Sequence, residues 1–434
     1  MSKTRRRGPR PLRICVCGLG YVGTVTAACL ARLGHIVKGV DVIASKVEAL
    51  NEGRAPFVEA GLSELVASMA ATGRLSATMK TALAVHQSDM TLVCVGTPSR
   101  EDGSLNSDFV LRVSAEIAKV LREIDGYHIV AIRSTVLPGM TRGEIVPILE
   151  RISGKRAGLE FGVCFNPEFL REGTAIQDFF DPSRTVIGEL DSRSGDLLAT
   201  AYHGVSGPVL RISLATAEIV KYTDNWWHAL KVAFANEVGA IAEAGGVDPR
   251  EVMEIFALDT KLNLSAKYLQ PGLPFGGSCL PKDLRALTHL ARGHNLRLPL
   301  LEAVLPSNVA HSARILQVLR ASGAKRVGIL GLTFKPGTDD TRESPIVELI
   351  VALLEADVDV RVHDRNVNLA ELVGTNRTLL VQRIPDLPDR LMANPEVVFQ
   401  SVDVVIVAHD TKEYQALIGR YNGRVPIIDF ARLC

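Results

Sequence analysis

The stretch RICVCGLGYVGTVTAACLARLGHIVKGVD, residues 13–41, decides the fold. It begins with the apolar, strand-like run Arg13–Cys17 and passes through a glycine-rich turn. The helix-like run Thr24–Leu33 follows, and a second strand-like run, Ile36–Val40, leads to Asp41. This order of strand, glycine-rich turn, helix and strand predicts a βαβ unit of a doubly wound parallel sheet.

The glycine-rich turn predicts an NAD site. It reads Gly18-Leu19-Gly20-Tyr21-Val22-Gly23, in which the glycines allow a tight turn and let backbone N–H groups approach a pyrophosphate at the helix N-terminus. Asp41 can accept hydrogen bonds from ribose hydroxyls and would repel a 2′-phosphate, which favours NAD over NADP. Lys46 is either a contact to the adenosine or a solvated helix lysine. A tight βα turn without a nucleotide is the alternative for the whole motif.

Polar residues follow further strand-like runs of the first half. Thr97 comes after Met90–Val95, Thr135 after Ile129–Ile132, and Glu168 after Val163–Phe165. In parallel sheets, ligands bind beyond the carboxyl ends of the strands, so these residues are candidates for a site.

The pattern changes near residue 215 and changes back near residue 325. The middle is helix-like at Ala217–Ala244, Val247–Phe256 and Pro281–Arg292. Strand-like runs then return at Arg326–Leu330, Val358–Val362, Val402–Val407 and Val425–Ile428. We therefore expect an α/β protein with two Rossmann-like, doubly wound parallel-sheet domains joined by a helical domain with a long central helix. The expected parts are a disordered basic tail at 1–12, an NAD-binding domain at 13–213, a helical middle domain at 214–320 and a second Rossmann-like domain at 321–434.

Charge and cysteine content exclude several classes of function. The 434 residues carry 49 basic and 48 acidic side chains, so no global field attracts nucleic acid or a membrane surface. No apolar run is long enough to span a membrane. The seven cysteines are odd in number and lie mostly in apolar runs, which favours reduced thiols in the cytoplasm. Cys15 and Cys17 have no partner pair, so no metal site is expected.

The stretch FGGSCLPKD, residues 275–283, holds the candidate nucleophile. Cys279 stands just before a proline that can open a helix, and Lys282 is near. A helix N-terminus and a cation should lower the pKa of this thiol and make it a better nucleophile. Asp283 is about one helical turn further on and shares its face. The alternative is a buried structural thiol.

A polar stripe on the central helix is the second candidate site. It consists of Lys221, Asn225, His228 and Asn236, which at helical spacing fall within roughly an 80° arc. Such a stripe suits a ligand-facing surface, and a solvent-exposed face with chance spacing is the alternative.

Two further clusters of charge have two interpretations each. Glu168 and Glu172 would lie on one side of a helix and could serve as general acid or base, or they could form a salt bridge through Arg171 at a helix start. Lys335 and Arg342, in FKPGTDDTRESP at 334–345, could bind phosphate or be ordinary surface charges.

Taken together, these stretches resemble the nucleotide-sugar 6-dehydrogenase family. GLGYVG, VGTPS, RSTVLPG, NPEFLREG, the Lys221 helix, FGGSCLPKD and FKPGTDDTRESP occur in the family's order and approximate spacing, from about Arg13 to Phe430. Residues 187–198, 225–239 and 261–272 are most similar to the branch of the family that oxidises GDP-mannose.

The resemblance implies an NAD-dependent, four-electron oxidation of the sugar C6 hydroxyl. Cys279 would add to the intermediate aldehyde, and the resulting thiohemiacetal would be oxidised to a thioester and hydrolysed. Lys221 and Asn225 would stabilise the oxyanion, while Thr135, Asp283 and either Glu168 or Glu172 would hold or activate the water.

The resemblance also implies ligand contacts and an assembly. Lys335 would contact the sugar nucleotide, and Lys282 and Arg342 would lie near the cofactor. The substrate-binding set would comprise Glu172, Lys221, Asn225, His228, Asn236, Tyr268, Gln270, Leu273, Gly276 and Lys335. Family members are commonly dimers joined through the middle helix, and their products feed acidic polysaccharides.

One loop departs from the GDP-mannose pattern. Lys267, Tyr268 and Gln270 stand where two adjacent tyrosines and an arginine are usual, and Leu273 replaces an aromatic residue. The missing arginine removes a forked donor for phosphate or base. A UDP-sugar substrate is therefore the near alternative, and a non-catalytic regulatory protein that binds NAD and a sugar nucleotide is the alternative of a different class.

Overall fold

The computed structural model describes residues 10–260, 271–293, 295, 298–369, 372, 374–400 and 402–431. The chain forms two compact units, Met1–Tyr222 and Thr223–Cys434. The expected tail lies outside the described residues up to position 9. Among the helices of the described part, none is long and apolar enough to cross a membrane.

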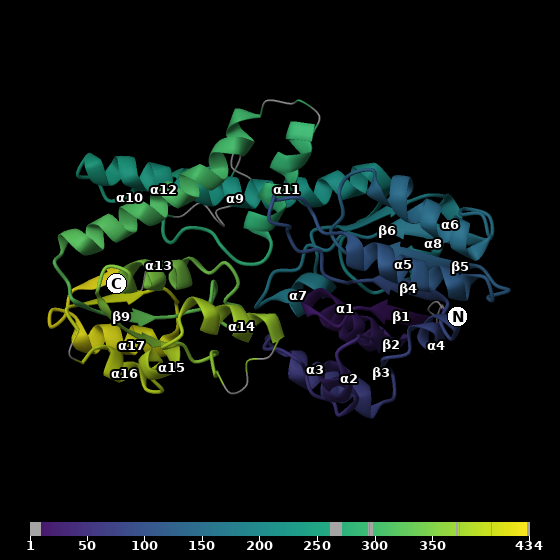
Figure 1. Ribbon diagram of the computed structural model, residues 1–434, viewed down its shortest axis with the longest axis horizontal. Helices are drawn as coiled ribbons and strands as arrows, with labels where there is room; N and C mark the ends of the chain where they lie inside the picture. Colours follow the sequence, from purple (N-terminus) through teal and green to yellow (C-terminus); the bar gives the residue numbers. More distant parts are fainter. Residues whose placement is uncertain are drawn as a thin grey trace, which may run out of the picture. The chain divides into compact units, whose positions relative to one another are not determined.

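The first unit is built on an eight-stranded sheet (Figure 1). Its strands are β1 Arg13–Cys17, β2 Ile36–Val40, β3 Leu75–Thr78, β4 Met90–Val93, β5 His128–Ile132, β6 Phe161–Phe165, β7 Thr185–Glu189 and β8 Val209–Ser213. They lie in the order β3-β2-β1-β4-β5-β6-β7-β8. The first six strands are parallel and have the Rossmann order, which confirms the predicted fold class. The β6–β7 pairing is antiparallel, which the expectation of a parallel sheet did not include.

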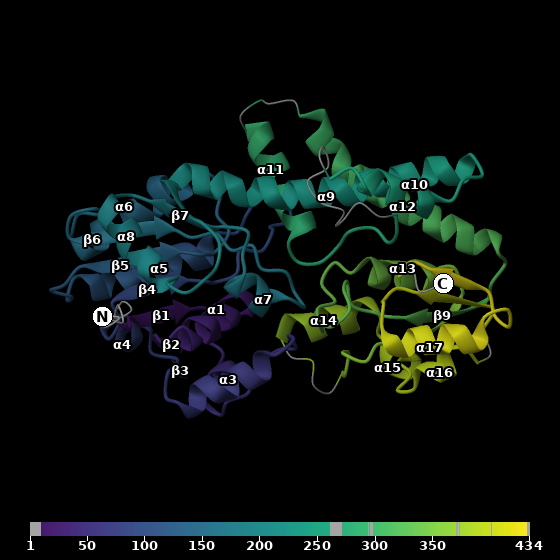
Figure 2. The same ribbon diagram turned by 180° about the vertical axis from the view of Figure 1, so that it is seen from behind.

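Helices cover both faces of this sheet (Figures 1 and 2). Ile14 and Val16 of β1 belong to the core on one face, with residues of α1 Tyr21–Arg32, α3 Leu62–Ala71, α7 Ala175–Phe180 and α8 Ser192–Ala201. Cys15 and Cys17 point to the opposite core, with α4 Thr81–His86, α5 Asp108–Leu121 and α6 Val146–Ser153. A short helix α2, Ala44–Asn51, follows β2, and the π-helix η1, Thr141–Ile145, precedes α6. This alternation along β1 is what a strand buried on both faces requires.

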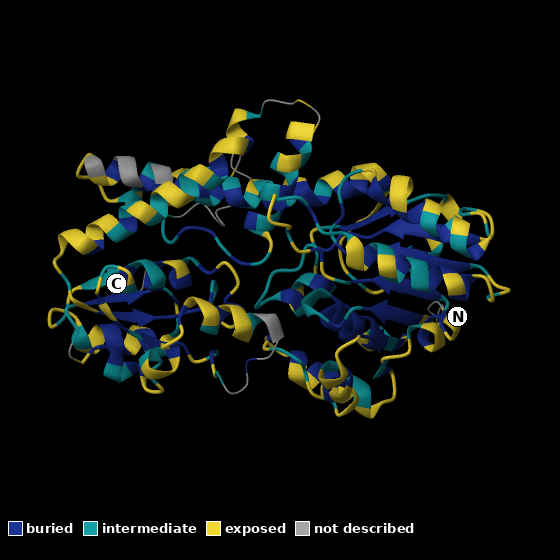
Figure 3. Ribbon diagram, viewed as in Figure 1, coloured by how far each residue is buried: buried dark blue, intermediate teal, exposed yellow. Residues whose placement is uncertain are grey.

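The predicted central helix is present as α9, Leu214–Ala244, which continues from the first unit into the second. The second unit continues with α10 Pro249–Ala257, α11 Leu280–Gly293 and α12 Pro299–Ala321. A parallel sheet follows in the order β10-β9-β11-β12, with β9 Arg326–Leu330, β10 Asp359–His363, β11 Val404–Val407 and β12 Ile427–Asp429. Its helices are α13 Pro345–Leu354, α14 Gly374–Arg383, α15 Leu387–Arg390, α16 Pro395–Val398 and α17 Lys412–Tyr421. Most strands of both sheets are buried, while the helices expose one side (Figure 3).

The first turn of the second sheet repeats the first turn of the large sheet. Gly18 has a φ of 97°, and the N–H of Leu19 donates to Asp41 at 2.7 Å. In the second sheet Gly331 has a φ of 105°, and the N–H of Leu332 donates to Asp364 at 2.8 Å. In both turns, a carboxylate at the end of the second strand holds the backbone that leaves the first strand. The expectation of a second Rossmann-like unit is confirmed at this level of detail.

Candidate active site

The glycines of the first turn have different local surroundings. A Cβ added at Gly23 would lie 1.8 Å from the carbonyl oxygen of Gly18, and one at Gly18 would lie 2.8 Å from that of Cys94. A Cβ at Gly20 would meet nothing within 4 Å. Helix α1 begins at Tyr21, and no side chain caps its N-terminus. The turn therefore leaves open space beside uncapped N–H groups, which fits the pyrophosphate of NAD.

Asp41 lies at the end of β2 and is almost completely buried. One carboxylate oxygen accepts from the N–H of Leu19 at 2.7 Å, and the other accepts from the N–H of Ile43 at 2.9 Å. The Nζ atom of Lys46 lies 3.6 Å from the carboxylate of Asp41, so Lys46 forms an ion pair with Asp41 and is not a fully solvated lysine. These contacts fix the carboxylate at the end of β2, beside the glycine-rich turn.

A buried arginine at the end of β5 was missed by the sequence reasoning. Arg133 donates to the side-chain oxygen of Asn166 at 2.7 Å, to the hydroxyl of Thr26 at 3.1 Å and to the hydroxyl of Tyr202 at 3.1 Å. The signal was available, because an arginine directly after an apolar strand needs buried acceptors. Arg133 ties the ends of β5 and β6 together. Thr97 is buried after β4, and Thr135 is half-buried two residues beyond Arg133.

Glu168 and Lys221 form a buried ion pair in the first unit. The Nζ atom of Lys221 lies 2.9 Å from a carboxylate oxygen of Glu168, and both side chains are less than a tenth exposed. Burial alone would raise the pKa of Glu168. The charge and hydrogen bond of Lys221 outweigh it, and Arg133 and the N–H of Leu170 add to them, so the pKa lies below its usual value. Glu168 is therefore held as a carboxylate beside the Nζ atom of Lys221.

The prediction that Glu168 and Glu172 share a helical face is wrong. Residues 166–171 have no regular structure, and α7 starts only at Ala175. Side-chain carboxylates, and not helical hydrogen bonds, accept from backbone N–H groups here. Glu168 accepts from the N–H of Leu170 at 2.8 Å, and Asp178 accepts from the N–H of Arg171 at 2.9 Å. The guanidinium of Arg171 also pairs with Asp178, at 2.5 Å. Glu172 is half-buried.

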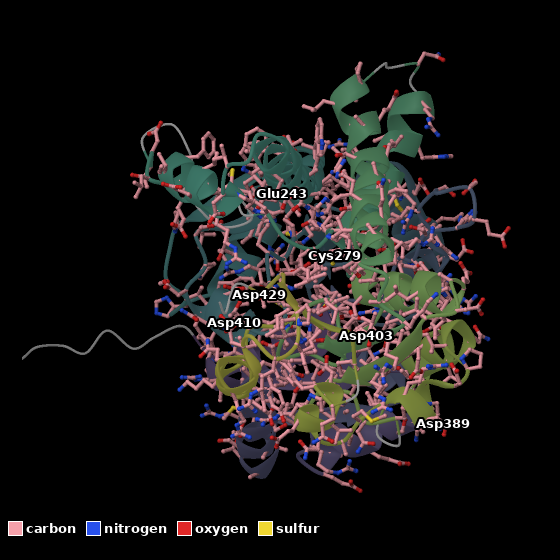
Figure 4. The ribbon with its side chains drawn as sticks, turned by 90° about the vertical axis from the view of Figure 1, so that its left-hand side faces the viewer. Glu243, Cys279, Asp389, Asp403, Asp410 and Asp429 are labelled. Atoms are coloured by element: carbon pink, nitrogen blue, oxygen red, sulfur yellow. The ribbon has the colours of Figure 1, made fainter. Side chains whose placement is uncertain are left out.

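The thiol of Cys279, which is labelled in Figure 4, is exposed, whereas the other cysteines of the described residues are buried. The interpretation as a buried structural thiol is therefore wrong. Helix α11 begins at the next residue, so the thiol stands at a helix N-terminus. The Ser278 hydroxyl lies 3.7 Å from the sulfur, and the N–H of Asp283 donates to the carbonyl oxygen of Cys279 at 2.9 Å.

Asp283 joins two candidate residues of the second unit. Its carboxylate is almost completely buried and accepts a hydrogen bond from the side-chain amide of Asn225. The Nζ atom of Lys282 lies 2.6 Å from the same carboxylate. An amide and an ammonium group on one buried carboxylate make a rigid polar group one turn along α11 from Cys279.

The polar stripe of α9 is not a solvent-exposed face. Lys221, Asn225 and Asn236 are buried and His228 is half-buried. Asn236 accepts from the N–H of Gly272 at 2.9 Å and donates to the carbonyl oxygen of Leu273 at 3.4 Å. Its amide thus anchors the backbone that leads into FGGSC.

The loop before FGGSC is described only in part. Lys267, Tyr268 and Gln270, which were predicted to decide the nucleotide, lie outside the described residues. Leu273 is half-buried and packs against the apolar core of the second sheet.

The loop 334–345 contacts the FGGSC stretch within the second unit. A Cβ added at Gly276 would lie 2.2 Å from the carbonyl oxygen of Glu343. Lys335 is half-buried. Arg342 is exposed but pairs with Asp340, at 2.6 Å and 2.9 Å. No group of three or more histidine, cysteine or acidic residues in the described parts of the chain could hold a metal ion.

Three family models match the chain. They describe the UDP-glucose/GDP-mannose dehydrogenase family: its NAD binding domain at residues 12–206, its central domain at 215–310 and its UDP binding domain at 328–433. The GDP-mannose 6-dehydrogenase of Pseudomonas putida is 46% identical over 418 residues, which cover 96% of this chain and 95% of that protein.

Solved structures agree with this assignment. A UDP-glucose dehydrogenase from the hyperthermophilic archaeon Pyrobaculum islandicum matches with a TM-score of 0.88 and 37% identity, covering 98% of this chain and 96% of that one. A ternary complex of GDP-mannose dehydrogenase from Pseudomonas aeruginosa matches with a TM-score of 0.58 and 44% identity, covering 97% of each chain. The chain therefore belongs to the UDP-glucose/GDP-mannose dehydrogenase family and is an NAD-dependent oxidoreductase.

Proposed function

We propose that the chain oxidises the C6 hydroxyl of GDP-mannose to a carboxylate and so forms GDP-mannuronate. The observation that carries the proposal is the exposed thiol of Cys279 at the N-terminus of α11, one turn from the buried carboxylate of Asp283 that contacts Asn225 and Lys282. A second oxidation at the same carbon needs a nucleophile that converts an aldehyde into an oxidisable adduct, and a thiol is suited to this. The identity to the Pseudomonas putida enzyme supports GDP-mannose as the substrate.

The thiol acts between the two oxidations. Residues of the Gly18–Gly23 turn, with Asp41, would hold NAD, which would supply the hydride acceptor for both oxidations. Cys279 adds through sulfur to the aldehyde carbon and gives a thiohemiacetal, whose oxidation leaves a thioester. Water then cleaves the carbon–sulfur bond, which releases the carboxylate and restores the thiol. The partial positive charge at the start of α11 favours the anionic form of the sulfur both as nucleophile and as leaving group.

The charged groups have complementary tasks. Lys221, which is paired with Glu168, stabilises the oxyanion of the adduct. Asn225 uses one N–H on Asp283 and has a second for the same oxyanion. Because its pKa is lowered, Glu168 is ionised and can orient the attacking water with Thr135 and Asp283, but it is a weak base and has no proton to donate. Glu172 is the other candidate base.

The remaining contacts follow from the family. Lys335 would bind the sugar nucleotide, with His228, Gly276 and the loop 267–273, and Lys282 and Arg342 would lie near the cofactor. We also propose the domain division 13–213, 214–320 and 321–434 and a homodimer joined through α9. The 42% exposure of both Trp227 and Phe234 on α9 supports such an interface.

A UDP-sugar is the second candidate substrate. The matching third domain is described as UDP binding, and the Pyrobaculum islandicum enzyme acts on UDP-glucose by its name. Leu273 stands where the GDP-mannose enzymes usually have an aromatic residue, and it packs against the core of the second sheet. Initial rates with GDP-mannose, UDP-glucose and a UDP-N-acetylhexosamine, each with NAD⁺ and NADP⁺, test the proposal. Turnover of GDP-mannose with NAD⁺ but not with NADP⁺ supports the proposal, and turnover of a UDP-sugar but not of GDP-mannose contradicts it.

A further inference from the structure

Glu343 has an unusual backbone conformation beside the candidate nucleophile. Its φ is 47°, and among the described residues only Asn295 and Asp357 are other non-glycine residues with a positive φ. A residue with a Cβ has a steric cost in this region and keeps it only where the surroundings impose it. The conformation gives Glu343 two separate contacts to the FGGSC stretch and its helix.

The backbone of Glu343 contacts the chain before Cys279. Its carbonyl oxygen accepts from the N–H of Gly277 at 3.3 Å. The same oxygen lies where a Cβ on Gly276 would approach to 2.2 Å, so only glycine fits there. Gly277 has a φ of 83°, and a Cβ added to it would lie 2.9 Å from ring carbons of Phe334. The two glycines of FGGSC are therefore required by the loop 334–345 that packs on them.

The side chain of Glu343 contacts the chain after Cys279. Its two carboxylate oxygens accept from the two terminal nitrogens of Arg285 at 2.6 Å and 2.9 Å. Arg285 belongs to α11, the helix that starts directly behind Cys279. The contact is bidentate, which fixes orientation as well as distance. One residue thus holds the segment on both sides of the thiol.

We propose that Glu343 and Arg285 are positioning residues that fix Cys279 for its attack on the aldehyde. This inference rests on the proposed role of Cys279 as nucleophile. Neither side chain needs to contact the substrate, because the pair acts through the geometry of residues 276–285. A displacement of the nucleophile by about 1 Å can lower the rate about 100-fold, so a loss of 10- to 100-fold is expected without the pair.

The test compares Glu343→Gln, Arg285→Ala and the double variant with wild type. The matched control is Glu396→Gln, which breaks the surface pair Arg420–Glu396 at 2.8 Å on α16 and α17, whose glutamate is 35% exposed against 40% for Glu343. We expect kcat to fall by about 10- to 100-fold in each single variant while KM for nucleotide sugar and NAD⁺ changes by less than about threefold. The Tm should fall no further than in the control. The double variant should lose no more than the worse single variant, because both remove one interaction.

Three further readouts decide the interpretation. The rate of alkylation of Cys279 by iodoacetamide should change in the single variants and stay as in wild type in Glu396→Gln. Arg285→Lys should restore only part of kcat, because an ammonium group cannot replace the fork. A wild-type kcat in Glu343→Gln and Arg285→Ala would overturn the inference, as would an activity loss that only follows a fall in Tm. A fully active Cys279→Ser enzyme would instead refute the proposed function, so the two failures are distinguishable.

Discussion

Replacing Lys221 by methionine tests the buried ion pair at its most sensitive point. The methionine side chain is nearly as long as that of lysine but uncharged, so Glu168 would stay buried without its cation. Removing one partner of a buried pair costs about 3–5 kcal/mol, because the other charge stays desolvated. For a unit of this size, that corresponds to a fall in Tm of roughly 6–20 °C. Lys46→Met is the control, since Lys46 is 28% exposed and 3.6 Å from Asp41, and should cost far less.

The pH dependence gives this prediction its sign. In wild type the pKa of Glu168 is lowered on folding, so its stabilising contribution is present above the unfolded pKa and is lost as pH falls through the folded pKa. In Lys221→Met the effect of burial on Glu168 outweighs the remaining contacts, and the pKa of Glu168 should rise above its usual value. The loss of stability should then be largest near pH 8 and smaller near pH 5, where Glu168 takes up a proton.

Thermal melts of both variants at pH 5 and pH 8 check this, with Lys221→Met/Glu168→Gln as the neutral pair. The double variant should recover most of the lost stability at pH 8, since it contains no uncompensated buried charge. A Lys221→Met protein as stable as wild type at pH 8, or one destabilised equally at both pH values, would refute the reasoning.

Two more predictions concern the dinucleotide turn and the thiol. Gly23→Ala should unfold or strongly destabilise the first unit, because its Cβ would lie 1.8 Å from the Gly18 oxygen. Gly20→Ala should keep the Tm of the wild type and raise KM for NAD⁺ about tenfold or more, because its Cβ fills the open space beside the turn. Thermal melts and NAD⁺ titrations separate the two variants, and equal behaviour would contradict the assignment of this turn to NAD. Iodoacetamide should label Cys279 of the native enzyme before Cys15, Cys17, Cys29, Cys94 and Cys164, because only Cys279 is exposed among the described cysteines. Peptide mass spectrometry over time, with Cys279→Ser as control, measures this order, and earlier labelling of a buried cysteine would contradict it.

The parts of the fold that follow from local pattern could be predicted from the sequence. Arg13–Cys17, Ile36–Val40 and Arg326–Leu330 are strands with the predicted bounds, because short apolar runs that end at a glycine or an aspartate have few other stable outcomes. The edge strand β8 was missed, since its residues are mostly exposed and its apolar residues are interrupted by Arg211. Helix α12 was missed because Pro306 lies inside it, where a proline usually ends a helix.

The candidate site shows where local pattern is not enough. Glu168 and Glu172 have helical spacing, but side-chain acceptors satisfy the backbone there and no helix forms. The partner of Glu168 is Lys221, which is 53 positions away, and the partner of Glu343 is Arg285, 58 positions away. Nothing in the spacing of charges along a sequence identifies such pairs, because they depend on which loops the fold brings together.

The central claim is a four-electron oxidation through Cys279, and the amount of NADH formed per sugar tests it most directly. Purified enzyme is given limiting GDP-mannose and excess NAD⁺, and the absorbance of NADH is followed to completion, with Cys279→Ser in parallel. The account predicts two NADH per GDP-mannose for wild type and no completed second oxidation for the variant. One NADH per sugar in wild type, or two in Cys279→Ser at the wild-type rate, would contradict it.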